Sequence, residues 1–188
     1  MERTVARVAL FAALIAALGL IPQIVIPFAG GVPITAQTLG IMLAGLILGP
    51  WRALLAVLVF LAVLAMGAPL LAGGRGGLGV FAGPTVGFLI GWPVAAIVTG
   101  WLFRMMAGTQ GRPGRFQAKF WPGVIASIVG GILALYLFGV VGMAVVTDLS
   151  LAAATLAVLI FIPGDVLKAV VAGLIAQQAA RARPDLLE

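Results

Sequence analysis

The sequence predicts an all-α membrane protein with about six transmembrane helices in a single domain that spans residues 1–188. Three observations predict this fold class: 63% of the residues are hydrophobic, only 9% are charged, and the mean hydropathy is +1.26. Soluble domains carry about 25% charged residues, so a water-soluble fold could not bury this much apolar surface. One transmembrane helix needs about 20 apolar residues, and the length leaves room for about six such helices and short loops.

The composition also limits the chemistry that the chain can perform. It contains no Cys and no His, which removes thiol nucleophiles, the usual general base and the usual zinc ligands. We therefore expect no catalytic residues, no metal site and no enzymatic activity. The formal net charge is +6, and in so apolar a chain we attribute it to membrane topology rather than to nucleic acid.

The first three predicted spans cover residues 5–26, 35–48 and 53–71. The first resembles a signal peptide, but its apolar run is longer than a usual signal core and further spans follow, so we interpret it as a retained helix. The second is short for a full bilayer crossing, which predicts that its beginning lies inside the membrane. Gly49 and Pro50 predict a tight turn between the second and third spans.

The last three predicted spans cover residues 81–105, 120–146 and 163–178. A single helix over the 36 residues from 148 to 183 would be about 54 Å long, against a hydrocarbon core of about 30 Å. Pro163 predicts a break there, because proline suits the first turn of a helix. We therefore expect residues 149–162 to form a partly helical segment that lies at one interface or re-enters the membrane.

Most basic residues follow the positive-inside rule when both termini are placed in the cytoplasm. Nine of them then lie on the inner side: Arg3, Arg7, Arg52, Arg104, Arg112, Arg115, Lys119, Arg181 and Arg183. The other two, Arg75 and Lys168, lie toward the outer face. Asp165 precedes Lys168 by three positions, which places both side chains on one helical face. The charges that topology does not explain are therefore predicted to cluster.

Ionisable groups inside a membrane domain cost about 2.5–3.5 kcal/mol each at a helix centre and mark functional sites by default. Each of these three residues also has a structural alternative. Asp165 could cap a helix start, and Arg75 could be an interfacial anchor. Lys168 could extend outward to the interface or pair with Asp165 alone. The five glycines around Arg75 favour a site, because they allow the backbone to approach a ligand closely, although they could also form only a flexible turn.

The candidate ligand-binding residues lie on four of these elements. They are Arg75, Asp165, Lys168, Gly77, Gly79, Thr35, Gln37 and Phe88. Thr35 and Gln37 could simply be polar residues at a helix start, and Phe88 could face lipid rather than a pocket. Together the set predicts a site for a small, anionic and partly apolar ligand. No nucleophile stands with a base, which favours binding over catalysis.

Three ordered stretches resemble the BioY family, the biotin-specific substrate-binding subunits (S components) of energy-coupling factor (ECF) transporters. They are residues 32–50, which begin VPITAQTLG, residues 72–85, which begin AGGRGGLG, and residues 163–169, PGDVLKA. The resemblance implies an S-component fold of six helices. It also implies that biotin binds near the outer face, below the loops that follow the first and third spans.

The resemblance implies partners as well. A transmembrane coupling subunit and two ATP-binding subunits would drive biotin uptake across the cytoplasmic membrane, so ATP would be used only by the partners and this chain would need no cofactor. Ala9, Ala13 and Ala17 form a stripe of small residues that another helix could approach closely, and the resemblance implies that the coupling subunit docks there. Arg75 or Lys168 would neutralise the biotin carboxylate, and Asp165 would bind the ureido ring.

Four alternatives remain from the sequence. The chain could be an S component for another small anionic vitamin, or a self-contained secondary transporter, although no internal halves are detectable. An intramembrane hydrolase would need a nucleophile and base that the composition disfavours. A purely structural subunit would bind no small ligand at the outer face.

Overall fold

The structure, a computed structural model, describes residues 2–24, 32–107 and 120–182. Within these residues it is built from helices, and the β pairs are two isolated bridges, Ile24 with Ile34 and Leu71 with Arg75. The predicted all-α class is confirmed for this part of the chain.

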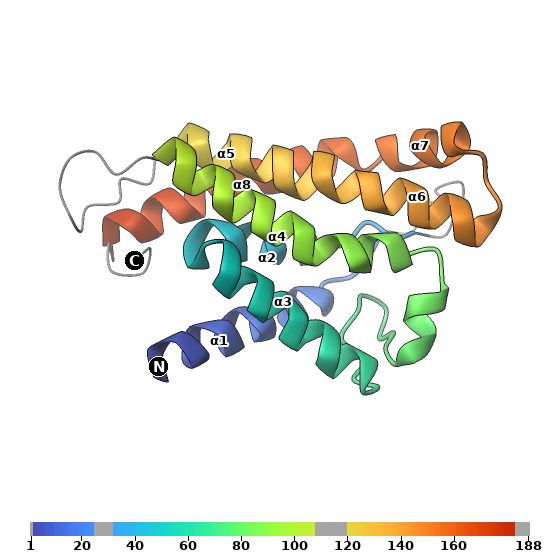
Figure 1. Ribbon diagram of the computed structural model, residues 1–188, viewed down its shortest axis with the longest axis horizontal. Coiled ribbons are helices and arrows are strands. Elements are labelled where there is room, and N and C mark those ends of the chain that lie inside the picture. The colour runs from blue at the N-terminus through green and yellow to red at the C-terminus, as the bar shows by residue number, and fades with distance from the viewer. Residues whose placement is uncertain (1, 25–31, 108–119, 183–188) are drawn as a thin grey trace.

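The helices pack side by side in an elongated bundle (Figure 1). Their bounds are α1 Glu2–Gly19, α2 Gln37–Leu48, α3 Pro50–Ala65, the 3₁₀ helix η1 Leu78–Ala82, α4 Val86–Ala107, α5 Phe120–Ile128, the π-helix η2 Val129–Ala134, α6 Leu135–Thr147, α7 Leu151–Leu159 and α8 Ile162–Ala182. Helices α5, η2 and α6 form one continuous element, and α7 and α8 meet at a bend of 54°.

Two described elements, α4 and the continuous helix Phe120–Thr147, are each long and apolar enough to cross a membrane. The bent pair of α7 and α8 makes a third if it is one span, whereas α2 and α3 are shorter apolar helices. The molecule thus has the apolar helices of an integral membrane protein. Six separate crossings and cytoplasmic termini stay predictions.

Helix α1 ends at Gly19, whereas the first span was predicted to continue to residue 26. Pro22 accounts for the difference, because proline disfavours the helical conformation of the residue before it. The chain instead becomes extended, and Ile24 exchanges two backbone hydrogen bonds of 3.1 and 2.9 Å with Ile34.

Two other boundaries also differ from the prediction. Helix α3 ends at Ala65 rather than near residue 71, because Gly67 adopts a φ of 109°, which is outside the helical range. Helix α4 begins at Val86 rather than at residue 81, and Gly83 and Pro84 separate it from η1. The glycine-rich segment around Arg75, between α3 and α4, is consequently longer than predicted.

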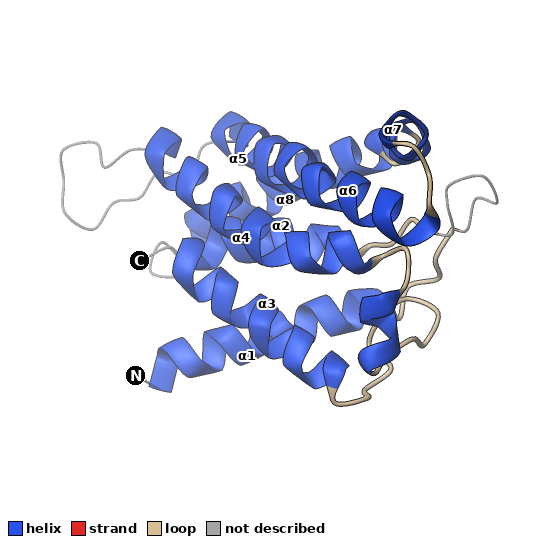
Figure 2. Cartoon of the chain, turned by 45° about the vertical axis from the view of Figure 1, so that its right-hand side comes forward, coloured by secondary structure: helices blue, strands red, loops and turns tan. Residues whose placement is uncertain are grey.

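One end of the bundle gathers the start of α1, the turn between α2 and α3, and the end of α8 (Figures 1 and 2). The end of α4 joins them, since Arg104 Nη2 donates to the Leu48 carbonyl at 3.3 Å. Of the nine basic residues predicted to be cytoplasmic, five are described and belong to these segments: Arg3, Arg7, Arg52, Arg104 and Arg181. Arg112, Arg115, Lys119 and Arg183 lie outside the described residues.

Glycines bring α4 and α6 into close contact, which positions the side chains of the site described below. A Cβ added to Gly87 would lie 2.9 Å from the Cα of Gly142 and 3.0 Å from its N, and nearer still to the Phe138 carbonyl. Small residues let helix backbones pack closely in a membrane, where no hydrophobic effect drives helices together.

We expect Gly87→Val to separate α4 from α6 and to lower stability by about 1–3 kcal/mol, the usual cost of overpacking. Ala62→Val, on an exposed position of α3, is the matched control and should be nearly neutral. The measurement is the thermal unfolding midpoint in detergent micelles, and equal midpoints for the two variants would contradict this packing.

Candidate functional site

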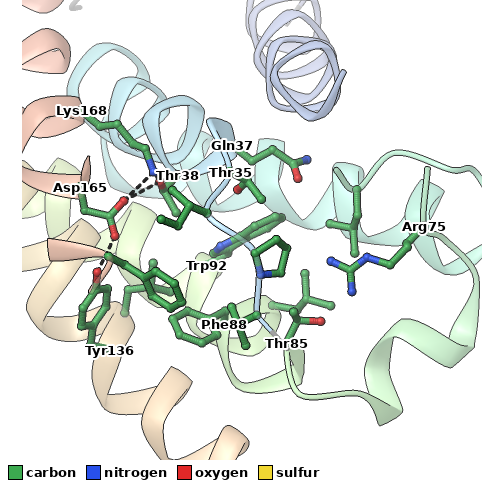
Figure 3. Close-up of a pocket in the computed structure, with 17 residues that line it drawn as sticks. Thr35, Gln37, Thr38, Arg75, Thr85, Phe88, Trp92, Tyr136, Asp165 and Lys168 are labelled. Atoms are coloured by element: carbon green, nitrogen blue, oxygen red, sulfur yellow. Dashed lines mark hydrogen bonds and ion pairs between the residues drawn. The ribbon is translucent and has the colours of Figure 1, made fainter. Parts of the chain in front are cut away.

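A cavity with an empty volume of about 570 Å³, including its open mouth, lies between the beginnings of α2, α4, α6 and α8 and the loop after α3. Its lining is mostly apolar, with charged groups at separate places: Asp165 and Lys168 lie on one side and Arg75 on the other (Figure 3).

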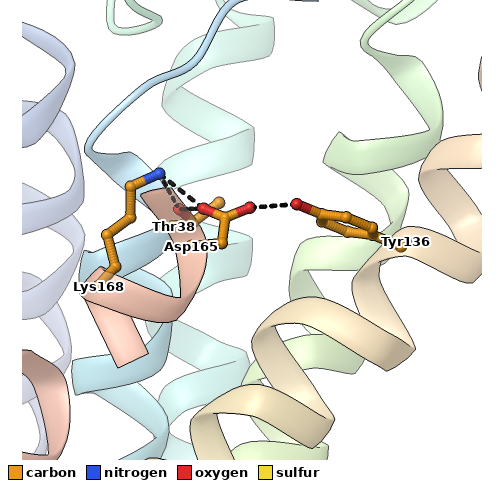
Figure 4. Close-up of polar contacts among 4 residues, drawn as sticks. All are labelled: Thr38, Tyr136, Asp165 and Lys168. Atoms are coloured by element: carbon orange, nitrogen blue, oxygen red, sulfur yellow. Dashed lines mark hydrogen bonds and ion pairs between the residues drawn. The ribbon is translucent and has the colours of Figure 1, made fainter. Parts of the chain in front are cut away.

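Asp165 is the centre of a polar cluster at one end of the cavity (Figure 4). Its Oδ2 accepts a hydrogen bond of 2.6 Å from the Tyr136 hydroxyl, and its Oδ1 accepts one of 3.2 Å from Thr38. Lys168 Nζ donates to Asp165 Oδ1 at 2.7 Å and to Thr38 Oγ1 at 3.1 Å. The side chains of Asp165 and Lys168 are only 6% and 15% exposed, so each charge depends on the other for compensation.

Aromatic side chains form the middle of the cavity. Phe88 meets Tyr136 and Phe161 edge to face, with ring centroids 6.2 and 6.5 Å apart. Trp92 packs on Phe60 with centroids 5.6 Å apart. Gly139 leaves the space for the Phe88 ring, because an added Cβ would overlap it. The wall is therefore fixed by packing rather than by loop conformation.

Two buried donors in this lining have no hydrogen-bond partner in the described structure. They are the Trp92 indole Nε1 and the Thr85 hydroxyl, on residues that are 5% and 7% exposed. A buried polar group without a partner costs about 1–3 kcal/mol, and a ligand with acceptor atoms would remove that cost. Both atoms therefore indicate that the cavity is built to be filled.

Arg75 approaches the cavity from the end opposite to Asp165, with its guanidinium directed inward beside Thr85 (Figure 3). Its Nε donates to the Ala72 carbonyl at 3.4 Å, and no carboxylate of the described residues pairs with it. The charge of Lys168 is already compensated by Asp165. Arg75 is therefore the cation available to an anionic group of a ligand.

Six of the eight predicted ligand-binding residues line this one cavity. They are Arg75, Asp165, Lys168, Thr35, Gln37 and Phe88. Gly79 lines a shallower adjoining hollow that shares Arg75 and Thr85 with the cavity. Gly77 lines neither. Its φ is 79°, and its N–H donates to the Leu64 carbonyl at 2.9 Å, so it shapes the loop that carries Arg75.

The geometry excludes two of the structural alternatives for these residues and agrees with a third. The Asp165 carboxylate accepts its hydrogen bonds from the side chains of Thr38, Tyr136 and Lys168, so it does not cap α8. Lys168 turns inward rather than outward and forms the i,i+3 ion pair with Asp165, which is the other structural alternative for this residue. Asp148 is exposed in the turn between α6 and α7 and does not line the cavity.

Sequence reasoning did not select Thr38, Tyr136, Thr85 or Trp92 as binding residues. Thr38 belongs to the VPITAQTLG stretch, so its polar side chain beside Gln37 was an available signal. Tyr136 is the only tyrosine in the chain. A single hydroxyl in an otherwise apolar helix was likewise an available signal. It could not show that this hydroxyl reaches Asp165, which lies 29 positions away in the sequence.

The alanine stripe of α1 lies on the outside of the bundle. Ala9, Ala13 and Ala17 are all exposed, whereas Phe11 and Ile15 on the opposite side are buried in the core. This face is therefore free to contact another helix. The described residues also contain no group of three or more His, Cys, Asp or Glu side chains that could hold a metal ion.

Comparison with known proteins gives one consistent result. The sequence profile of the BioY family matches residues 2–185. The biotin transporter BioY of Rhodobacter capsulatus is 48% identical over an alignment that covers 100% of this chain and 98% of that protein. The biotin transporter BioY of Rhizobium etli is 49% identical over 89% of this chain and 87% of its own length.

A solved structure has the same fold. It is the crystal structure of the S component for biotin from an ECF-type ABC transporter, with a TM-score of 0.83 and 30% identity, over 96% of this chain and 92% of that one. The S-component fold predicted from the sequence is thereby confirmed.

We expect Asp165→Ala to destabilise the ligand-free protein by roughly 3 kcal/mol, because it leaves the Lys168 ammonium buried without its partner. The double variant Asp165→Ala/Lys168→Met removes both charges and should recover most of this loss. Thermal unfolding in detergent measures both, and a double variant as unstable as the single one would contradict the mutual compensation.

Proposed function

The chain belongs to the BioY family, and from this premise we propose that it captures biotin in the cavity as the S component of an ECF transporter. The assignment of the cavity rests on the polar groups at its two ends. A buried carboxylate–ammonium pair lies at one end, an arginine that pairs with no carboxylate of the described residues lies at the other, and aromatic walls lie between them. Biotin has the same sequence of groups, with a ureido ring, an apolar ring and chain, and a carboxylate.

The cluster around Asp165 has an unused hydrogen-bond acceptor and an unused donor, as a ureido group requires. A carboxylate offers about four lone-pair sites, and Tyr136, Thr38 and Lys168 occupy three of them. An ammonium has three N–H donors, and Lys168 uses two. One acceptor on Asp165 and one donor on Lys168 are left, and these match a ureido N–H and the ureido carbonyl.

Arg75 and Thr85 are suited to the carboxylate end. A guanidinium binds a carboxylate through two parallel N–H donors, and the unpartnered Thr85 hydroxyl can add a third bond. The proposal therefore assigns the carboxylate to Arg75 rather than to Lys168, and the ureido ring to Asp165. Phe88, Phe161 and Trp92 contact the apolar part of the ligand.

The stripe Ala9, Ala13 and Ala17 is the proposed docking surface for the transmembrane coupling subunit, to which two ATP-binding subunits attach. Its exposure on an apolar helix supports this role. The whole assembly would lie in the cytoplasmic membrane and move biotin inward. Within it, this chain would bind the vitamin, and we expect it to need no catalytic residue, metal or cofactor of its own.

Binding of biotin to the purified protein tests the function and the site together. Asp165→Asn, Lys168→Ala and Arg75→Ala each remove a hydrogen bond to a charged group, and we expect each to weaken binding by about 10–150-fold. Asp148→Asn, at the exposed acid outside the cavity, is the control and should bind like the wild type. Wild-type affinity in all three cavity variants would refute the proposed site.

A second assay distinguishes biotin from other small vitamins. A thermal-shift screen with biotin, lipoate, pantothenate and riboflavin should raise the unfolding midpoint only with biotin. Stabilisation by a different vitamin would keep the S-component role and replace the substrate, whereas stabilisation by none would favour a structural subunit.

Docking is tested by enlarging the stripe. We expect Ala13→Trp to abolish co-purification with the coupling subunit and to leave biotin affinity unchanged, because the substituted position faces away from the cavity. Ala62→Trp, on an exposed position of α3, is the matched control. Normal complex formation by Ala13→Trp would exclude this face as the docking surface.

A further inference from the structure

Gln37 lines the cavity, but its hydrogen-bonding groups are already used within the protein. It is the first residue of α2 and is 1% exposed. Its Nε2 donates to the carbonyls of Ile15 at 3.2 Å and of Leu70 at 3.1 Å, and its Oε1 accepts from the Ala72 N–H at 3.3 Å. An amide NH₂ has only two hydrogens, so Gln37 has no donor left for a ligand.

The three partners of Gln37 belong to two elements that are distant in sequence. Ile15 lies near the end of α1, and Leu70 and Ala72 lie in the loop after α3. That end of α1 is packed tightly against the amide, since a Cβ added to Gly19 would lie 3.0 Å from Gln37 Nε2. Gln37 therefore joins α1 to this loop through one buried planar group.

The part of the loop that Gln37 holds is the part that carries Arg75. The Leu71 N–H donates to the Arg75 carbonyl and the Gly74 N–H to the Leu71 carbonyl, both at 3.0 Å. Arg75 Nε in turn donates to the carbonyl of Ala72. Residues 71–75 thus form a small closed turn, and Gln37 bonds the backbone on its N-terminal side.

We propose that Gln37 is a positioning residue, which holds the turn of residues 71–75 against α1 so that Arg75 faces the cavity. It acts on the ligand through Arg75 and not by direct contact. The effect on binding rests on the proposed function, in which Arg75 binds the biotin carboxylate. A consequence is that α1, which bears the exposed alanine stripe, is linked to the Arg75 end of the cavity through one side chain.

A double-mutant cycle with two ligands tests this role. Gln37→Met keeps the length and helix propensity of the side chain but removes its three hydrogen bonds, and biotinamide replaces the carboxylate of biotin by a neutral amide. We expect Gln37→Met to weaken biotin binding by about tenfold and to change biotinamide binding by less than about twofold. In an Arg75→Ala background Gln37→Met should add nothing, because residues that act as one unit are not additive.

Gln178→Met, at an exposed glutamine of α8, is the matched control. Gln37→Asn, which stays neutral but shortens the reach of the amide by one methylene, is the second variant if Gln37→Met does not fold. An equal loss for both ligands, or a loss that persists in the Arg75→Ala background, would overturn the proposal.

Hydrogen exchange of the ligand-free protein separates this proposal from the proposed function. Gln37→Met should increase exchange of the Ala72 amide and of residues 71–75, whereas Gln178→Met should not. If the wild type bound no biotin, the function would fail while the exchange result still decided whether Gln37 holds the turn. Unchanged exchange in Gln37→Met would refute the positioning role in either case.

Discussion

The carboxylate of Asp165 lies inside a helical bundle, where an uncompensated charge would be costly. Its compensation comes from three helices, because Thr38 stands on α2, Tyr136 on α6 and Lys168 on α8 itself. This requirement constrains the relative positions of these helices. It also leaves one acceptor on Asp165 and one donor on Lys168 unused, and both residues line the cavity. The contacts that stabilise the bundle therefore also form one end of the proposed binding site.

The rest of the architecture keeps that cluster in place. Helix α2 begins inside the bundle, which brings Thr38 within reach of α8, and Gln37 at the same helix start holds the loop of Arg75. Glycines at 87 and 142 allow α4 and α6 to approach until Phe88 and Tyr136 meet edge to face. The short helix α2 and the glycine contacts between α4 and α6 therefore hold the Arg75 guanidinium and the Asp165–Lys168 ion pair at opposite ends of the cavity.

Much of this arrangement could be predicted from residue patterns of short range. Composition indicates the membrane class, and the spacing of Asp165 and Lys168 predicts their ion pair, which the structure confirms. The glycine loop around Arg75 indicates where the backbone bends. The partners of Asp165 at positions 38 and 136 could not be predicted, because they depend on how α2, α6 and α8 pack. The helix ends near Gly19 and Ala65 were also missed, since a single Pro or Gly outweighs a continuing apolar run.

In the proposed complex, biotin lies across the cavity with its ureido ring on Asp165 and its carboxylate on Arg75. Determination of the structure of the biotin complex tests it most directly. The account predicts a ureido N–H within hydrogen-bond distance of Asp165, the ureido carbonyl at Lys168, and the carboxylate on the Arg75 guanidinium and the Thr85 hydroxyl. A carboxylate on Lys168, or biotin bound outside this cavity, would contradict it.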